Sequence, residues 1–269
     1  ETVAVLVMIL LCIPVLFIYF SFFANAFILD STGELTLQNF QFLYQPIQLS
    51  QYTVEPIGKA FRNTVIFTAI ATTLEVTISC MAGYALARME FTGKRVISFS
   101  LLTLRLFPGV LLLIGVLYVL LHLGILNTLT GVIVVAIALR LPGSTFIIRN
   151  FFAGIPQDIE NSALVDGCNR LTAFFQVIIH MVKPGLAPIS IFAFMSAWSN
   201  YLLFNVLIFN TKTPVLATYL RVLSRNDQMI ADYGVFAAMA MVYMLPVLIF
   251  FFISQRQLMQ GTISGGKGI

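Results

Sequence analysis

Three ionisable residues, Glu75, Arg105 and Arg140, lie inside long apolar stretches of the sequence. A charge within a membrane-spanning segment is expensive, so such residues usually pair with one another or serve a solute pathway. In one hypothesis Glu75 pairs with an arginine, or an arginine extends to the membrane interface. In the other, Arg105 or Arg140 lies beside a polar cavity that a solute crosses. A guanidinium there would bind a carboxylate through two hydrogen bonds, which would favour an acidic solute.

A second group of candidate binding residues is the sequence Trp198-Ser199-Asn200. An aromatic ring beside an amide and a hydroxyl suits a sugar, which has apolar C–H faces surrounded by hydroxyl groups. The same residue types also concentrate where membrane helices pack against each other. Both interpretations stay open, and the first places Trp198, Ser199 and Asn200 in a substrate pathway with Arg105 and Arg140.

The segment from Ile155 to Gly167 has the composition of a short helix with a defined start and end. Pro156 can begin a helix because its missing N–H is not needed in the first turn, and the acids that follow lie near the positive end of the helix dipole. Gly167 permits the left-handed conformation that ends a helix. The sequence therefore predicts a short, stiff helix within the loop 150–183, with small residues that leave one side open to another surface.

The sequence contains no pattern typical of catalysis or metal binding. It has no Ser-His-Asp or paired-carboxylate arrangement, and His122 and His180 are far apart, as are the three cysteines. Gly261, Gly266 and Lys267 have the spacing of a phosphate-binding loop, but the next residue is Gly, so the hydroxyl that binds Mg²⁺ in such loops is missing. We expect no enzyme activity, and no metal, nucleotide or other cofactor bound by this chain.

The composition places these candidates in a membrane protein surrounded by lipid. Of 269 residues, 59% are hydrophobic and 10% are charged, with a mean hydropathy of +0.95, whereas a soluble domain carries about 25% charged residues. The net charge of +4 is spread too thinly for a nucleic-acid partner. A helix crosses a bilayer with about 20 apolar residues. The stretches that qualify predict an all-α membrane protein with six transmembrane helices in a single domain, 1–269; they are 3–23, 61–86, 96–121, 129–152, 184–209 and 233–253.

The distribution of Lys and Arg predicts which loops face the cytoplasm. The side that includes both termini and the loop 150–183 carries eight basic residues: Arg88, Lys94, Arg95, Arg149, Arg170, Lys183, Arg256 and Lys267. The other side carries five: Lys59, Arg62, Lys212, Arg221 and Arg225. This excess predicts cytoplasmic termini. The first apolar run is longer than the roughly 7–15 residues of a signal-peptide core, so we interpret it as a retained span. Because the chain begins at Glu1 rather than Met, we expect a short stretch to precede it.

Residues 160–180 resemble the EAA loop of permease subunits of ATP-binding-cassette importers. The family pattern is Glu-Ala-Ala, then Gly, then Ile, Leu and Pro at fixed spacings. The corresponding residues here are Asn161, Ser162, Ala163, Gly167, Val177, Ile179 and His180. Asn161 therefore replaces the glutamate of the motif and His180 its proline, while Glu160 stands where the family often has a second acid. The resemblance implies that this chain couples to an ATPase through Glu160, Asn161, Ser162, Ala163, Asp166 and Gly167.

The resemblance extends over essentially the whole chain. The other matching motifs are Asn63-Thr64, Gly83 to Arg88, Phe107-Pro108, Leu123-Gly124-Ile125, Ala197 to Asn200 and the glycine-rich tail. Together they are similar to the MalG-like permeases of type I carbohydrate importers. That family implies a complex with a second, MalF-like permease, two ATPase subunits that bind ATP and Mg²⁺, and an extracytoplasmic solute-binding protein, in a bacterial or archaeal cytoplasmic membrane.

The sequence thus favours a multi-pass pathway subunit of an ATP-driven importer of sugars or oligosaccharides. The alternative is a self-sufficient secondary transporter or channel. That alternative is disfavoured because the sequence shows no inverted repeat of the kind such transporters use, and because six spans are few for one.

Overall fold

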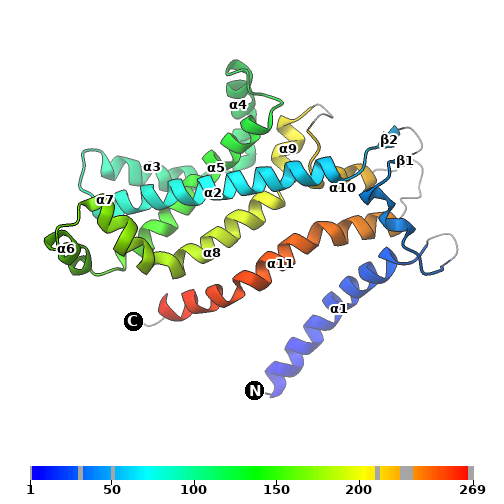
Figure 1. Cartoon of the computed structure of the whole chain (residues 1–269), viewed down its shortest axis with the longest axis horizontal. Helices are drawn as coiled ribbons and strands as arrows, with labels where there is room; N and C mark the ends of the chain where they lie inside the picture. Colours follow the sequence, from blue (N-terminus) through cyan, green and yellow to red (C-terminus); the bar gives the residue numbers. More distant parts are fainter. Residues whose placement is uncertain (1, 30–32, 50–51, 210–212, 225–232, 266–269) are drawn as a thin grey trace. The chain divides into compact units, whose positions relative to one another are not determined.

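The computed structural model describes residues 2–29, 33–49, 52–209, 213–224 and 233–265 (Figure 1). The chain divides into two compact units. Unit 1 comprises residues 1–64 and 214–248, and unit 2 comprises residues 65–213 and 249–269. Helices α2 (Gly58–Arg88) and α11 (Tyr233–Gly265) contribute residues to both units, so the single domain over 1–269 stays a prediction.

Unit 1 contains the first helix of the chain and a small hairpin. Its other elements, besides the first parts of α2 and α11, are α1 (Thr2–Ala26), the 3-10 helix η1 (Gln38–Leu43), β1 (Ile47–Leu49), β2 (Tyr52–Val54) and α10 (Leu216–Ser224). The strands pair antiparallel, with Ile47 opposite Val54. The buried Asn39 on η1 supplies hydrogen-bond donors to backbone carbonyls at and just after the end of α1. Its Nδ2 donates to the carbonyls of Ala26 (3.1 Å) and Ile28 (2.8 Å).

Unit 2 is built around α5 (Leu129–Ala153), which packs against α3, α8 and α9. Its other elements, besides the remaining parts of α2 and α11, are α3 (Lys94–Leu106), α4 (Gly109–His122), α6 (Gln157–Val165), α7 (Arg170–Ala173), the π-helix η2 (Phe174–Ile178), α8 (Ile179–Trp198) and α9 (Tyr201–Leu207). The side chain of Thr128 caps α5 by accepting a hydrogen bond from Gly131 N (3.0 Å), as expected of an N-cap threonine.

Two helices approach α5 closely because they carry glycine at the contact. At Gly83 on α2, a Cβ atom would lie 2.9 Å from Ile148 Cγ2 and 3.0 Å from Arg149 N, both on α5. At Gly185 on α8, a Cβ atom would overlap the ring of Phe151. The missing side chains therefore set the spacing of α2, α5 and α8.

Three helices are long and apolar enough to cross a membrane, namely α2, α5 and the part of α11 from Tyr233 to Gln255. Two bent regions pass the same test as pairs: α3 with α4, and the run from Arg170 to Trp198. Helix α1 adds a shorter apolar stretch, Leu10–Ala26. The all-α membrane class is confirmed, and each predicted span coincides with a helical region of the described residues. The count of six crossings stays a prediction.

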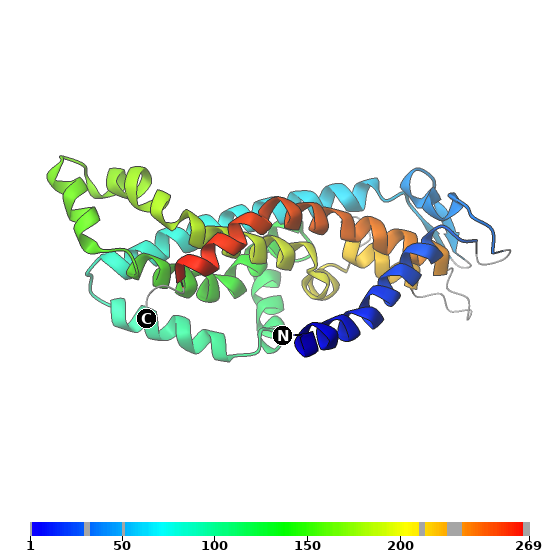
Figure 2. The same ribbon diagram turned by 90° about the horizontal axis from the view of Figure 1, so that it is seen from below.

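Two predicted spans are wrong as continuous helices. In the span 96–121, α3 and α4 meet at an angle of 108° (Figure 2). Phe107 is extended there (ψ 128°), because a residue before proline is disfavoured in the helical conformation. The helix found in the predicted span 184–209 begins before residue 184, as part of α8, and it is interrupted after Trp198. Asn200 then starts α9 by accepting a hydrogen bond from Leu203 N (3.3 Å).

Candidate functional site

Helix α6 forms where the sequence predicts a short helix. Pro156 is extended directly before it (φ −56°, ψ 134°), and Asp158 and Glu160 lie in its first turn. Gly167 follows its end with a φ of +92° and donates a backbone hydrogen bond to Leu164 O (3.1 Å). A residue with a Cβ atom adopts this φ only with strain, so the prediction that Gly167 turns the chain is confirmed.

The predicted coupling residues divide between two faces of α6. Glu160 and Ala163 are buried, with 4% and 8% of their surface exposed. The remaining ones, together with Val165, are exposed and form what we call the outer face of α6: Asn161, Ser162, Val165, Asp166 and Gly167. Because most of these side chains are short, the outer face allows the close approach of another surface. A role in coupling stays a prediction for all of them.

Glu160 joins α6 to the C-terminal end of α2 through buried polar contacts. The Tyr84 hydroxyl donates a hydrogen bond to Glu160 Oε1 (2.7 Å), and Arg88 Nε forms an ion pair with Glu160 Oε2 (3.5 Å). Arg88 Nη2 also donates to the carbonyl of Ile155, just before α6. The side chains of Arg88 and Glu160 are 8% and 5% exposed, so water screens the pair little. We call Tyr84, Arg88 and Glu160 the α2–α6 junction.

Aromatic packing fixes the junction to the core of unit 2. The Tyr84 ring lies 5.6 Å from the Phe152 ring on α5 and 4.6 Å from the Phe174 ring on η2, measured between centroids. These rings belong to a buried cluster that also includes Cys80, Ile148, Ile178, Val182 and Ile189. Helices α6 and α7 lie at the same end of unit 2 as the C-terminal end of α2 (Figure 1). Helix α6 is therefore held by packed helices as well as by its two flanking loops.

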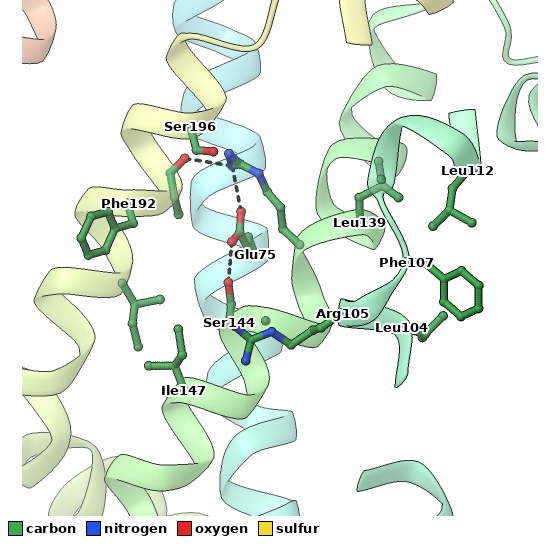
Figure 3. Close-up of a pocket in the computed structure, with 15 residues that line it drawn as sticks. Glu75, Leu104, Arg105, Phe107, Leu112, Leu139, Ser144, Ile147, Phe192 and Ser196 are labelled. Atoms are coloured by element: carbon green, nitrogen blue, oxygen red, sulfur yellow. Dashed lines mark hydrogen bonds and ion pairs between the residues drawn. The ribbon is translucent and has the colours of Figure 1, made fainter. Parts of the chain in front are cut away.

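The second candidate site is a cavity of about 360 Å³ in unit 2 (Figure 3). In it, Arg140 Nη1 on α5 lies 3.3 Å from Glu75 Oε2 on α2 and also donates to the carbonyl of Ala193 on α8 (3.2 Å). Ser144 Oγ donates to Glu75 Oε1 (2.6 Å). The hypothesis that Glu75 pairs with an arginine is confirmed, and its partner is Arg140.

Arg105 lines the same cavity from α3 and lies over α5. Its guanidinium carbon is 5.6 Å from the centroid of the Phe146 ring, and a Cβ atom at Gly143 would lie 3.8 Å from its Nε. In the part of the chain that the structure describes, no carboxylate forms an ion pair with Arg105. The other lining side chains are mostly apolar and include Phe107 and Phe192, with Ser196 adding a hydroxyl.

The three remaining candidate residues are not among those that line the cavity. Trp198 is buried, with its ring 5.9 Å from that of Phe194, which stacks on Phe250 at 4.0 Å. Ser199 Oγ donates to a carbonyl of α8, and Asn200 caps α9. The structure brings Arg105 and Arg140 together, but it places Trp198, Ser199 and Asn200 at the break between α8 and α9. Their assignment to a substrate pathway stays a prediction.

The sequence predictions give no role to Tyr84, Arg88 or Ser144 in these sites. A signal was available, because Tyr84 and Arg88 are four residues apart on one helix, as are Arg140 and Ser144. Residues at that spacing share a helix face. No metal site adds to these two places: among the described residues, no group of three or more His, Cys, Asp or Glu is arranged to hold a metal ion.

Apolar helices, a short exposed helix between α5 and α8 in the chain, and a cavity that contains charged side chains fit a membrane transport subunit. Residues 75–263 match the family of binding-protein-dependent transport system inner membrane components. The chain belongs to this family. It is therefore a membrane permease component and not itself a catalytic subunit, which confirms the family assignment made from the sequence.

Similar proteins are permease proteins of uptake or transport systems. The chain is 32% identical to the diacetylchitobiose uptake system permease protein NgcG of Streptomyces coelicolor, over 96% of this chain and 84% of that protein. It is 28% identical to the maltodextrin transport system permease protein MdxG of Bacillus subtilis, over 90% and 84%. It is 29% identical to the sulfoquinovosyl glycerol transport system permease protein SmoH of Agrobacterium fabrum, over 88% and 84%.

A solved structure shares the fold. It is a chain in the crystal structure of a bacterial ABC transporter involved in the import of the acidic polysaccharide alginate. The TM-score is 0.79, with 95% of each chain covered and 19% identity.

The α2–α6 junction can be tested by removing its acid. The variant Glu160→Ala leaves Arg88 buried without its counter-ion, which should destabilise the junction by roughly 3–5 kcal/mol. We expect the backbone amides of α6 to exchange with deuterium at least tenfold faster in the purified protein, as measured by mass spectrometry. The matched control is Asp158→Ala, which removes an exposed acid from the same turn and should leave exchange unchanged. Equal protection in Glu160→Ala and the parent protein would contradict the junction.

Proposed function

We propose that this chain is one of two permease subunits in an ATP-driven importer of sugars or oligosaccharides. Membership of the binding-protein-dependent transport family establishes the class of transport system. The named cargoes of NgcG, MdxG and SmoH are saccharides or a glycoside, which supports a carbohydrate cargo here. The same family membership favours the importer over a self-sufficient secondary transporter or channel.

We propose that α6 carries the coupling to a separate ATPase subunit. The observation that supports this most strongly is the division of α6 between an exposed outer face and a buried Glu160. The outer face would seat on the ATPase, which binds ATP and Mg²⁺, while Glu160 and Ala163 hold α6 to the permease. The ATPase would then shift the permease between two conformations, provided that it binds them with different affinity.

The other partners and the orientation follow from the same proposal. A second, MalF-like permease would complete the pathway, and an extracytoplasmic solute-binding protein would deliver the sugar on the opposite side. The loop 150–183 and both termini would face the cytoplasm. A crystal structure of a bacterial alginate ABC transporter shows it in complex with a periplasmic protein that binds an alginate pentasaccharide. That complex supports such an assembly here.

Cysteine cross-linking tests the contact between α6 and the ATPase. In a variant of the full importer without native cysteines, Ser162→Cys on the outer face should cross-link efficiently to the ATPase. Ala163→Cys, the next residue but buried, should cross-link at least tenfold less. Cross-links are measured by gel shift after a short bifunctional reagent is added. If Ser162→Cys reacted with thiol reagents in the lipid or in water but never formed a cross-link to the ATPase, coupling through α6 would be wrong.

The turn after α6 can be tested at Gly167. Replacing Gly167 by Ala or Val strains a backbone with a φ of +92°, and should reorient the outer face. We expect ATP hydrolysis to continue while sugar uptake falls at least tenfold in Gly167→Val and less in Gly167→Ala. The control is Gly154→Ala, because Gly154 has an ordinary φ of −77° and room for a Cβ atom. Full uptake by Gly167→Val with normal ATPase association would refute the proposed role of the turn.

A further inference from the structure

We infer that the cavity beside Arg105 binds an anionic group, such as a carboxylate, on the saccharide that the importer carries. This inference rests on the proposed function and adds the chemical class of the cargo. It is carried by the charge, direction and surroundings of the Arg105 side chain.

The positive and negative charges of the side chains around the cavity do not cancel. Both carboxylate oxygens of Glu75 are occupied, one by Arg140 and the other by Ser144. Arg140 is satisfied further by the Ala193 carbonyl. Arg105 is then the cation left over, because no carboxylate in the described parts of the chain pairs with it. Within the described residues, the cavity therefore presents a guanidinium that no carboxylate pairs with.

The direction of Arg105 distinguishes a binding role from contact with the membrane interface. A snorkelling arginine extends along its own helix toward water. Arg105 instead lies over α5, with its guanidinium above the Phe146 ring and its Nε beside Gly143. Figure 3 shows the side chain on the side of the cavity where Ser144 and Glu75 lie. Arg105 is an exposed residue, so water, or an anion that enters the cavity, can reach its guanidinium.

The other lining groups suit a sugar that carries an acid. A guanidinium offers a planar pair of donors that matches the two oxygens of a carboxylate. Phe107 and Phe192 contribute aromatic surface for the C–H faces of a sugar ring, and Ser196 contributes a hydroxyl. The volume of about 360 Å³ is that of a small-molecule site. One end of an oligosaccharide would thus place its acid on Arg105 while its ring covers apolar surface.

Uptake measurements on the complete importer test this inference. Cells that express both permeases, the ATPases and the cognate binding protein receive a mixture of two kinds of oligosaccharide of matched length. The neutral kind consists of glucose or N-acetylglucosamine units, and the acidic kind consists of uronate units. Mass spectrometry measures which of them accumulate, with an ATPase-inactive strain as the blank. We expect the uronate oligosaccharides to accumulate. Arg105→Gln should lower their uptake at least tenfold at equal membrane content of the permease, and Arg105→Lys about threefold, because lysine keeps the charge but loses the planar pair of donors.

Arg95→Gln is the matched control, since Arg95 is an exposed arginine on the same helix and does not line the cavity; its uptake should equal that of the parent protein. ATP-dependent accumulation of neutral sugars alone would overturn this inference and leave the proposed function intact. Unchanged uronate uptake in Arg105→Gln would also overturn it. If Arg105→Gln does not reach the membrane, full uronate uptake by Arg105→Lys would count against it in the same way. Failure to accumulate any saccharide in an ATP-dependent manner would contradict the proposed function itself.

Discussion

The carboxylate of Glu160 is held between the Tyr84 hydroxyl and the Arg88 guanidinium, where water has little access. Separating a buried ion pair leaves a charge with neither a partner nor solvent, which is strongly unfavourable. The free energy therefore favours conformations in which helix α6 and the end of α2 move together. Everything that α6 contacts on its outer face is mechanically connected, through this carboxylate, to a helix long enough to cross a membrane.

Helix α2 also connects the two candidate sites. Glu75, in the wall of the cavity, and Arg88, in the junction, are 88 − 75 = 13 residues apart on this one helix. At 1.5 Å per residue this separation is about 20 Å. Between them, at Gly83, α2 lies close against α5, which carries Arg140 and Ser144. A displacement of α6 can thus reach the cavity through α2, one continuous helix, and through α5, which α2 approaches closely at Gly83.

Much of this arrangement could be predicted from the sequence, because it depends on local backbone rules. Pro156, the early acids and Gly167 predict α6 and its ends, and apolar length predicts where the long helices lie. The rest depends on contacts between distant segments. The sequence indicates that Glu75 needs a cation but does not choose between Arg105 and Arg140, since that choice depends on how α2 and α5 pack.

The errors have the same origin. Apolar length does not reveal that Pro108 turns the chain sharply between α3 and α4, or that Asn200 begins a new helix after Trp198. The sequence also does not reveal that Glu160 is buried while most of the other predicted coupling residues are exposed. Its burial depends on Tyr84 and Arg88, which lie more than 70 residues earlier in the chain. The hydrogen-bonding partner of a buried acid is a tertiary property that spacing on one helix does not reveal.

The most direct test of the account is a distance measurement between α6 and the end of α2 in the assembled importer. Spin labels at Asp158→Cys on α6 and Glu90→Cys just after α2, both exposed positions, report this separation by electron paramagnetic resonance in a protein without native cysteines. Because the α2–α6 junction moves as one body, we expect the same distance distribution in the nucleotide-free and ATP-bound states. A separation that changes or broadens when ATP binds would contradict it.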